Sequence, residues 1–391
     1  MDFQKLRKRR RRGIFLRRLL ILAAIIGAGF ALISLNNLLV RWQFPTMIVN
    51  FAQGFGGPGF PIRAPGGVLR DVTALGSDIA VLNDTSLHVY NRNGRERLGM
   101  QRISESTIML SSGNRMLTYT FLGTDFAIHF QNRIVLEGQH AQPIRTAALG
   151  ERGNYALVSS TWQFTSQVMV FDDRFDHPFS WGTSELVSIV ALNPRGTQMA
   201  AGSVGARGGQ LLSTVFLLDL FGAEEASARL ELTGELILGL EYLSDTHIGI
   251  ITDRGLRVMS AANGRLVNSY DITSGQLSLS RMSGGRILLL NEDPQYRAQT
   301  VILFGARGEE LGRTSPQSAV RDIQVGSTGV YVLTAQGVAR YDHTMNRTGK
   351  AEQTGILRIL LAANTLYYFT DEEIGVLRID VGQEEQTAAY Q

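Results

Sequence analysis

The chain has 391 residues and no cysteine, which excludes disulfides, thiolate metal sites and cysteine nucleophiles. Its net charge of +3 hides an asymmetry, because residues 1–41 hold ten of the 38 basic side chains and only one of the 35 acidic ones, Asp2. The remaining residues carry 28 basic and 34 acidic side chains, a net charge of −6, which argues against a nucleic-acid partner.

A membrane span is predicted near the N-terminus. A block of arginines and lysines is followed by 22 uncharged residues, Leu19 to Val40. A helix of that length reaches about 33 Å, enough for a hydrocarbon core of about 30 Å. The basic block predicts a cytoplasmic tail at 1–18, a transmembrane signal anchor at 19–40 and an extracytoplasmic location for the rest of the chain. A cleaved signal peptide is the alternative, although no small-residue cleavage site precedes Arg41.

Small residues recur within the predicted span at Ala23, Gly27 and Ala31. A four-residue spacing places them on one helix face, where two helix backbones can approach closely. This pattern suggests a dimer, and the alternative is that these are ordinary small residues of an apolar helix.

Residues 41–67 are predicted to form a linker. Nine glycines and prolines fall between Gly54 and Gly67, a composition typical of a flexible or extended segment. From residue 68 onward the sequence shows only strand and turn patterns, so the predicted ectodomain covers 68–391.

One pattern repeats eight times in this region: apolar strand, small-residue turn, apolar strand, polar turn and a third strand. The repeats lie about 35–50 residues apart, the period of four-stranded propeller blades, and open near Val72, Thr107, Ile144, Leu186, Ile237, Leu277, Ala319 and Ile356. The expected fold is therefore all-β, a β-propeller of eight blades, with seven as the alternative. Either Glu384–Ala389 or the segment around Phe60–Arg63 is expected to supply the strand that closes the ring.

Several third strands end in aspartate, at Asp172, Asp219, Asp342 and Asp380. With these endings, residues 68–391 resemble the YVTN, quinoprotein-like and WD40-like β-propellers. The resemblance implies the fold but no particular activity. The Trp-Asp and Gly-His marks of WD40 repeats are absent, and so is the regular tryptophan pattern of quinoprotein dehydrogenases, so no cofactor is expected. The layout also resembles bacterial membrane-tethered propellers of a domain family of unknown function, which implies the cell envelope.

No motif for a catalytic, cofactor or metal site is present. The sequence has no Gly-x-Ser-x-Gly, P-loop, His-Glu-x-x-His or EF-hand pattern, and its six histidines are scattered. Asp84, Asp253 and Asp371 occupy equivalent turns between second and third strands. They are either a ring of carboxylates at one mouth of the channel or, as we favour, turn residues that bond to their own backbone.

Three repeats carry a longer connection between the second and third strands, and these connections should all emerge on one face of the propeller. Insertions on one face of a repeat protein often mark its binding surface. Five residues there are of types common at interface hot spots, and they are the candidate partner-binding residues: Trp162, Phe164, Arg207, Tyr296 and Arg297. The alternative is loop growth without function, with the aromatic rings packed locally.

These features predict a single-pass protein of the cell membrane whose propeller is a non-enzymatic binding or scaffold module for a protein or a cell-envelope polymer. A sensor that signals through a membrane partner is a third possibility. The main alternative is a propeller enzyme, such as a lyase, hydrolase or quinone-dependent dehydrogenase, working in the central channel. Carboxylates that converge on the channel with perturbed pKa values would favour the enzyme.

Overall fold

The computed structural model describes residues 56–381, except 102, 132, 178 and 223–224. The chain divides into two compact units, Met1–Gly57 and Pro58–Gln391. The predicted tail, span and dimerisation residues therefore lie outside the described residues. Across 56–381, no helix has the length and apolar character that a membrane crossing requires.

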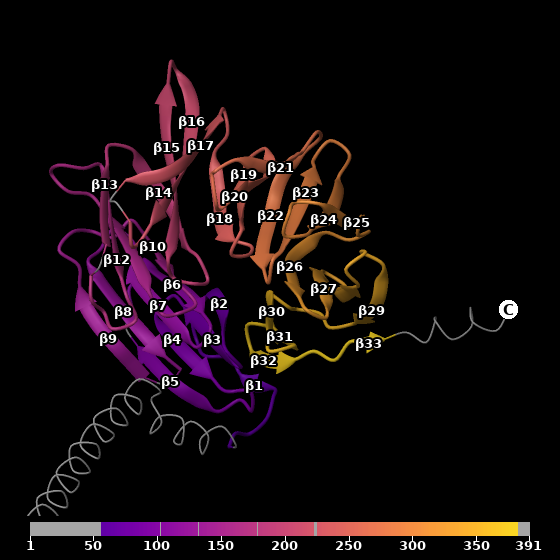
Figure 1. The fold of residues 1–391 in the computed structure, drawn as a ribbon. Helices are drawn as coiled ribbons and strands as arrows, with labels where there is room; N and C mark the ends of the chain where they lie inside the picture. The colour runs from indigo at the N-terminus through magenta and orange to yellow at the C-terminus, as the bar shows by residue number, and fades with distance from the viewer. Residues whose placement is uncertain (1–55, 102, 132, 178, 223–224, 382–391) are drawn as a thin grey trace, which may run out of the picture. The chain divides into compact units, whose positions relative to one another are not determined.

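The described part of the second unit is a ring of eight antiparallel sheets, which confirms the eight-bladed propeller and excludes seven blades (Figure 1). Blade 1 consists of β2 (Leu69–Leu75), β3 (Asp78–Asn83), β4 (Ser86–Tyr90) and β5 (Glu96–Gln101), and blade 2 consists of β6 (Thr107–Ser112), β7 (Arg115–Thr120), β8 (Asp125–Phe130) and β9 (Arg133–Gln139). Blade 3 consists of β10 (Thr146–Leu149), β11 (Tyr155–Ser159), β12 (Ser166–Phe171) and β13 (Phe179–Thr183), and blade 4 consists of β14 (Leu186–Leu192), β15 (Gln198–Arg207), β16 (Gln210–Asp219) and β17 (Ala226–Thr233).

Blade 5 consists of β18 (Ile237–Tyr242), β19 (His247–Thr252), β20 (Gly255–Ser260) and β21 (Leu266–Asp271), and blade 6 consists of β22 (Gln276–Ser283), β23 (Arg286–Asp293), β24 (Ala298–Phe304) and β25 (Glu310–Thr314). Blade 7 consists of β26 (Val320–Gly326), β27 (Gly329–Thr334), β28 (Gly337–Tyr341) and β29 (Arg347–Ala351), and β33 (Asp380–Val381) is its fifth strand. Blade 8 consists of β30 (Arg358–Ala362), β31 (Thr365–Phe369), β32 (Glu373–Val376) and β1 (Ile62–Arg63). In every blade the first strand in this order lines the central channel.

The core of the propeller lies between neighbouring blades. Side chains alternate along a strand, so each middle strand packs against two neighbours. In β3, Ile79 and Val81 belong to the cluster shared with blade 8, whereas Ala80 and Leu82 belong to the cluster shared with blade 2. Each of the eight buried apolar clusters joins one pair of adjacent blades. This double burial explains why the second strands read as continuous apolar runs.

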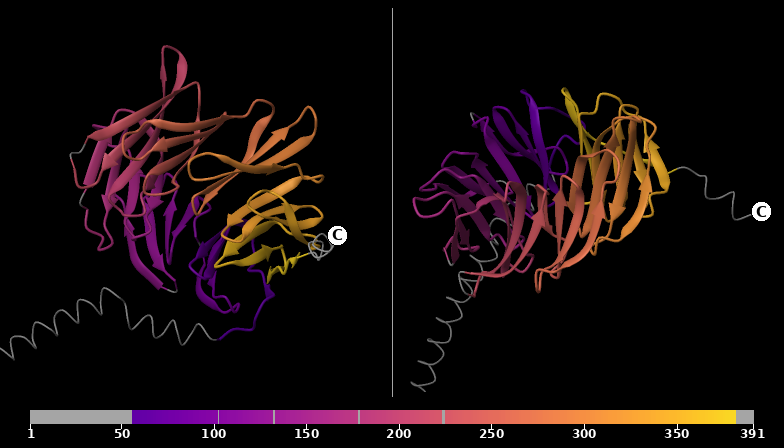
Figure 2. Two further views of the ribbon diagram at one scale, coloured as in Figure 1. Left: turned by 45° about the vertical axis from the view of Figure 1, so that its right-hand side comes forward. Right: turned by 90° about the horizontal axis from the view of Figure 1, so that it is seen from above.

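The ring is closed by β1, which pairs antiparallel with β32 through Ile62 and Ile374 and through Arg63 and Glu373. The indigo start of the described chain and its yellow end therefore lie side by side (Figures 1 and 2). The expectation that Phe60–Arg63 closes the ring is confirmed. The other candidate, Glu384–Ala389, is wrong as the fourth strand of blade 8, and it lies outside the described residues.

Two boundaries differ from the sequence prediction. The compact unit begins at Pro58, so the closing strand lies within the stretch predicted as linker. The third strand of the last repeat ends at Val376 instead of Asp380, and Asp380 belongs to β33, where it pairs with Lys350 of β29. The position of a two-residue strand is determined by the strand it pairs with. Two residues are too few to show the alternating pattern that would predict a strand from the sequence.

The closing strand offers a test of how the ring is stabilised. Ile62 packs in the cluster between blades 8 and 1, and its neighbour Phe60 makes an edge-on contact with Tyr367 at 5.2 Å between ring centroids. Because Ile62 is only partly buried, we expect Ile62→Ala to lower the free energy of unfolding by about 1–2 kcal/mol in urea denaturation. Arg63→Ala, on the exposed side of the same strand, should change it by less than about 0.5 kcal/mol. Equal losses in both variants would contradict a packing role for the closing strand.

Candidate functional site

Because neighbouring strands within each blade are antiparallel, the ring has two different faces. On one side, called the insertion face here, the second and third strands of each blade are joined and the chain passes to the next blade. On the opposite face, the first and second strands and the third and fourth strands are joined. All three lengthened connections belong to the insertion face, in blades 3, 4 and 6. The longest is the hairpin β15–β16, whose strands have ten residues each and project beyond the neighbouring sheets (Figure 1).

Two of the five candidate residues are freely accessible aromatics. Trp162, between β11 and β12, is 92% exposed, and Tyr296, between β23 and β24, is 73% exposed. The Tyr296 turn is held by Asp293, whose Oδ1 accepts hydrogen bonds from the backbone N–H groups of Gln295 and Tyr296. Arg297 completes this turn with a φ of 50°, in the left-handed region. The Tyr296 side chain is therefore presented on an ordered turn.

Phe164 and Arg207 are held more closely by their own blades. The ring of Phe164 lies so near Gly182 of β13 that a Cβ added there would be 2.4 Å from it. Arg207 makes a bidentate ion pair with Glu231 of β17, at 2.8 Å from Nη1 to Oε2 and 3.2 Å from Nη2 to Oε1. The five candidates thus share a face but form two groups, one on blades 3 and 4 and one on blade 6.

Exposed apolar side chains gather on the insertion face. Of the 16 large hydrophobic residues that are exposed in the described part of the chain, ten lie in its connections or at the strand ends that border it: Val68, Phe121, Leu122, Trp162, Phe164, Leu186, Leu236, Leu238, Tyr296 and Leu357. Phe221 belongs to the connections of the opposite face, and the other five lie at strand ends that border that face. The excess on the insertion face is therefore in its connections, with eight of these described residues against one. Most of these residues were not predicted from the sequence, although an apolar pair such as Phe121-Leu122 in a turn is a recognisable signal.

The aspartates of the second-to-third-strand turns do not form a ring of carboxylates. Oδ1 of Asp84 accepts a hydrogen bond from the N–H of Val68 at 3.1 Å, and Oδ1 of Asp253 accepts one from the N–H of Leu236 at 2.8 Å. Each carboxylate ties its turn to the connection that enters its own blade and not to the backbone of the turn itself, so both residues have a structural role that differs from the one we favoured. None of these three aspartates lines the central channel.

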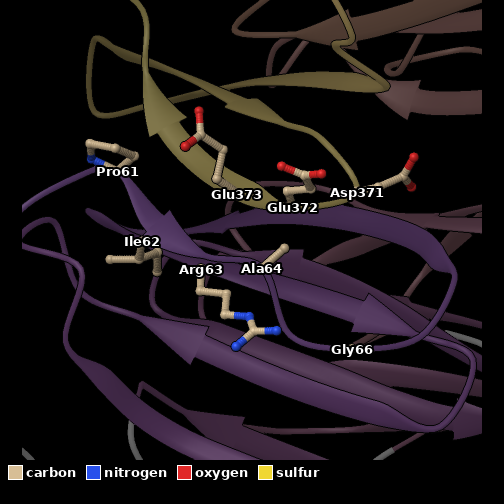
Figure 3. A pocket seen from close by; sticks show the side chains of 8 residues that line it. All are labelled: Pro61, Ile62, Arg63, Ala64, Gly66, Asp371, Glu372 and Glu373. Atoms are coloured by element: carbon tan, nitrogen blue, oxygen red, sulfur yellow. The ribbon is translucent and has the colours of Figure 1, made fainter.

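Asp371 borders a different pocket, of about 690 Å³, beside the closing strand. Its walls are the segment from Pro61 to Ala64, Gly66 and the turn Asp371–Glu373 (Figure 3). The three acidic side chains stand on the turn, while Arg63 points away from them on the facing strand. Oε1 of Glu373 accepts a hydrogen bond from the Tyr368 hydroxyl at 2.6 Å. The pocket is an acidic hollow next to the seam of the ring.

A larger cavity of about 770 Å³ occupies the central channel and is lined by the innermost strands of all eight blades. Asp322 is the most buried charged group of its wall, with an exposed fraction of 1%. Its two oxygens accept hydrogen bonds from the N–H groups of Ile323 and Ile359, at 2.9 and 3.0 Å, and Nη2 of Arg281 lies 3.6 Å from Oδ1. Asp322 therefore joins blades 6, 7 and 8.

Asp71 of β2 occupies the position in blade 1 that Asp322 occupies in blade 7, since each follows a bulge in its innermost strand. Asp71 lines the channel and is exposed, whereas Asp322 is buried. Burial raises the pKa values of both carboxyl groups, against the opposing effects of backbone hydrogen bonds and of Arg281 and Arg358. These four side chains form a compact group of alternating charge.

A second acidic group lies elsewhere on the channel wall. Glu241 comes from β18 of blade 5, and Glu151 follows β10 of blade 3. Burial, reinforced by the charge of Glu151, raises the pKa of Glu241 to about 7. Neither residue was singled out from the sequence, because their proximity results only from closure of the ring.

No protein-family model and no curated protein matches the sequence. Solved structures match the fold. A eukaryotic initiation factor superposes with a TM-score of 0.56 at 9% identity, covering 85% of this chain and 92% of that chain. The WD40 domain of SCAP from fission yeast superposes with a TM-score of 0.52 at 10% identity, covering 83% and 95%.

The chain has a WD40-like β-propeller fold. At these identities the similarity extends to the fold alone, and the finer resemblance to quinoprotein-like and bacterial membrane-tethered propellers stays a prediction.

The raised pKa of Glu241 makes stability depend on pH. Between about pH 4.5 and pH 7 the folded state holds a proton that the unfolded state has lost, so stability falls as the pH rises through this range. We expect Glu241→Gln to have little effect near pH 4.5 and to stabilise the protein by about 1–3 kcal/mol at pH 8, in urea denaturation at each pH. Glu137→Gln, on exposed β9, is the matched control. If Glu241→Gln stabilised the protein equally at pH 4.5 and pH 8, the raised pKa would not belong to Glu241.

Proposed function

We propose that the propeller is a binding module that takes a protein partner on its insertion face, and that the chain is held at the membrane, outside the cytoplasm, by the anchor at 19–40. One observation carries the first part: the connections of the insertion face hold eight exposed large hydrophobic side chains, whereas those of the opposite face hold one in the described part of the chain. Concentrated apolar surface of this kind is typical of protein interaction sites.

The path of the chain supports the same side. The Gly59 N–H donates a hydrogen bond to the carbonyl of Asn93, in the turn between β4 and β5. That turn belongs to the opposite face, so the chain enters the propeller there. The first described residues of the propeller unit thus lie beside the opposite face and not the insertion face. Trp162 and Tyr296, the most exposed of its aromatic residues, are residues of the type that anchors interfaces.

The location rests on the sequence. The arginine block before Leu19 and the uncharged stretch up to Val40 fit a signal anchor with its N-terminus in the cytoplasm. The net charge of −6 beyond residue 41 agrees with a domain that has no need to approach anionic lipid. A cell-envelope polymer is the other class of partner, but an apolar face with indole and phenol side chains favours a protein.

An enzyme working in the channel remains the second candidate, because one observation favours it. Glu241 lines a cavity of about 770 Å³ and has a pKa of about 7, a value suited to general acid–base catalysis near neutral pH. We rank it second because a buried glutamate beside another glutamate acquires such a pKa without any chemistry. The two functions separate experimentally: Glu241→Gln would abolish channel catalysis and leave partner binding on the insertion face intact.

The binding face can be tested by affinity capture with the whole chain, comparing wild type with Trp162→Ala plus Tyr296→Ala. Loss of two exposed aromatic anchors should weaken retention of a protein partner at least tenfold, since hot-spot aromatics contribute about 2 kcal/mol or more each. Phe221→Ala is the matched control, because Phe221 is a 77% exposed aromatic of the opposite face. Undiminished capture of every partner by the double variant would refute the proposed face.

The proposed topology can be tested by fusing alkaline phosphatase after residue 391. The enzyme folds only in an oxidising compartment, so an extracytoplasmic propeller predicts high phosphatase activity. A fluorescent protein that matures only in the cytoplasm should be dark at the same position. The reverse pattern would overturn the proposed location.

A further inference from the structure

The charges of the channel wall fall into two groups on opposite sides of the ring. Arg281, Asp322, Arg358 and Asp71 come from the innermost strands of blades 6, 7, 8 and 1, which are consecutive. Glu151 and Glu241 come from blades 3 and 5. In a ring of eight, blades 7, 8 and 1 lie across the channel from blades 3, 4 and 5, whereas Arg281 comes from blade 6, next to blade 5, and approaches Asp322 of blade 7. The groups are also electrostatically separate, because Asp71 and Asp322 are influenced by the two arginines, whereas Glu241 is influenced by Glu151.

The first group has unused hydrogen-bond donors. Both oxygens of Asp322 and one oxygen of Asp71 already accept backbone N–H groups. The closest approach of Arg281 to Asp322 is 3.6 Å, beyond hydrogen-bond range, and Arg358 donates no hydrogen bond to any of the described residues. Each guanidinium carries five N–H donors in a planar fork, which matches a carboxylate best. This side of the channel is therefore suited to an anionic acceptor.

The opposite side has unused acceptors. Within the described part of the chain, neither Glu151 nor Glu241 accepts a hydrogen bond, and no cationic side chain pairs with them. A cation between the two carboxylates would relieve their repulsion and supply the missing donors. An ammonium group carries three N–H donors, which suits two carboxylates that have no cationic partner in the described part of the chain.

We propose that the central channel binds a short peptide with both ends free, its C-terminal carboxylate on Arg281 and Arg358 and its N-terminal ammonium on Glu241 and Glu151. The two charges of a single amino acid are too close together to reach both walls. An extended peptide spans about 3.3 Å per residue, so two to four residues separate the charges by about 7–14 Å. The cavity of about 770 Å³ lies in the size range of small-ligand sites. This site is distinct from the insertion face and does not depend on the function proposed for it.

The test is isothermal titration calorimetry of the whole 391-residue chain in detergent with four probes: trialanine, N-acetyl-trialanine, trialanine amide and alanine. Wild type should bind trialanine, and blocking either end should weaken binding by about tenfold or more, because each block removes a charge-assisted contact. Alanine should bind at least tenfold more weakly than trialanine. This part of the test needs no variant and so does not depend on any variant folding.

Two variants then assign the ends. In Arg358→Gln, amidation should weaken binding less than it does in wild type, because only Arg281 remains for the carboxylate, while acetylation should weaken binding as much as before. In Glu241→Gln, acetylation should weaken binding less than in wild type, because only Glu151 remains for the ammonium, while amidation should weaken binding as much as before. Arg133→Gln and Glu137→Gln remove the same charges from the exposed outer strand β9. These variants should bind trialanine with wild-type affinity, and acetylation and amidation should weaken binding as they do in wild type. Thermal unfolding by circular dichroism verifies that each variant is folded.

The proposal is overturned if wild type binds no trialanine at millimolar concentration, or if all four probes bind alike. It is also overturned if the β9 variants lose affinity as strongly as the channel variants, because the effect would then follow net charge rather than the channel wall.

Discussion

The fold depends on a single pairing between the two ends of the propeller sequence. Eight sheets cannot bury their faces unless the last sheet meets the first, and that sheet obtains its fourth strand from β1, near the beginning of the unit. The pairing itself is only two residues long. It is effective because Phe60 and Ile62 also pack in the cluster between blades 8 and 1, so ladder hydrogen bonds and apolar burial form together.

The sequence was sufficient to predict the fold because of this mode of burial. Middle strands are covered on both faces, so they read as short apolar runs such as Ile79–Leu82, separated by turn residues at a regular period. The same rule does not identify two-residue strands, which have no pattern of their own. For that reason Phe60–Arg63 was one of two candidates for closure, and Asp380 was assigned to the wrong blade.

The candidate sites were only partly predictable, for separate physical reasons. Exposure of Trp162 and Tyr296 follows from their place in inserted turns, whereas the packing of Phe164 on Gly182 and the pairing of Arg207 with Glu231 depend on which strands become neighbours. The charged residues of the channel wall could not be predicted from the sequence. Asp71 and Asp322 directly follow β-bulges, and a bulge adds a residue that breaks simple alternation. Glu151 and Glu241 line the same channel only because blades 3 and 5 are arranged around it.

The position of β1 has a mechanical consequence. Every force that reaches the propeller from the residues before Pro58 must pass through a strand held by two residue pairs, and it acts directly on the seam. If the N-terminal segment is fixed and a bound partner is pulled away, tension falls first on the junction of blades 8 and 1 rather than on the strong sheets at the far side of the ring. Resistance to pulling is then set by the weakest sheet edge, so under load the ring would open between blades 8 and 1 while its blades stay folded.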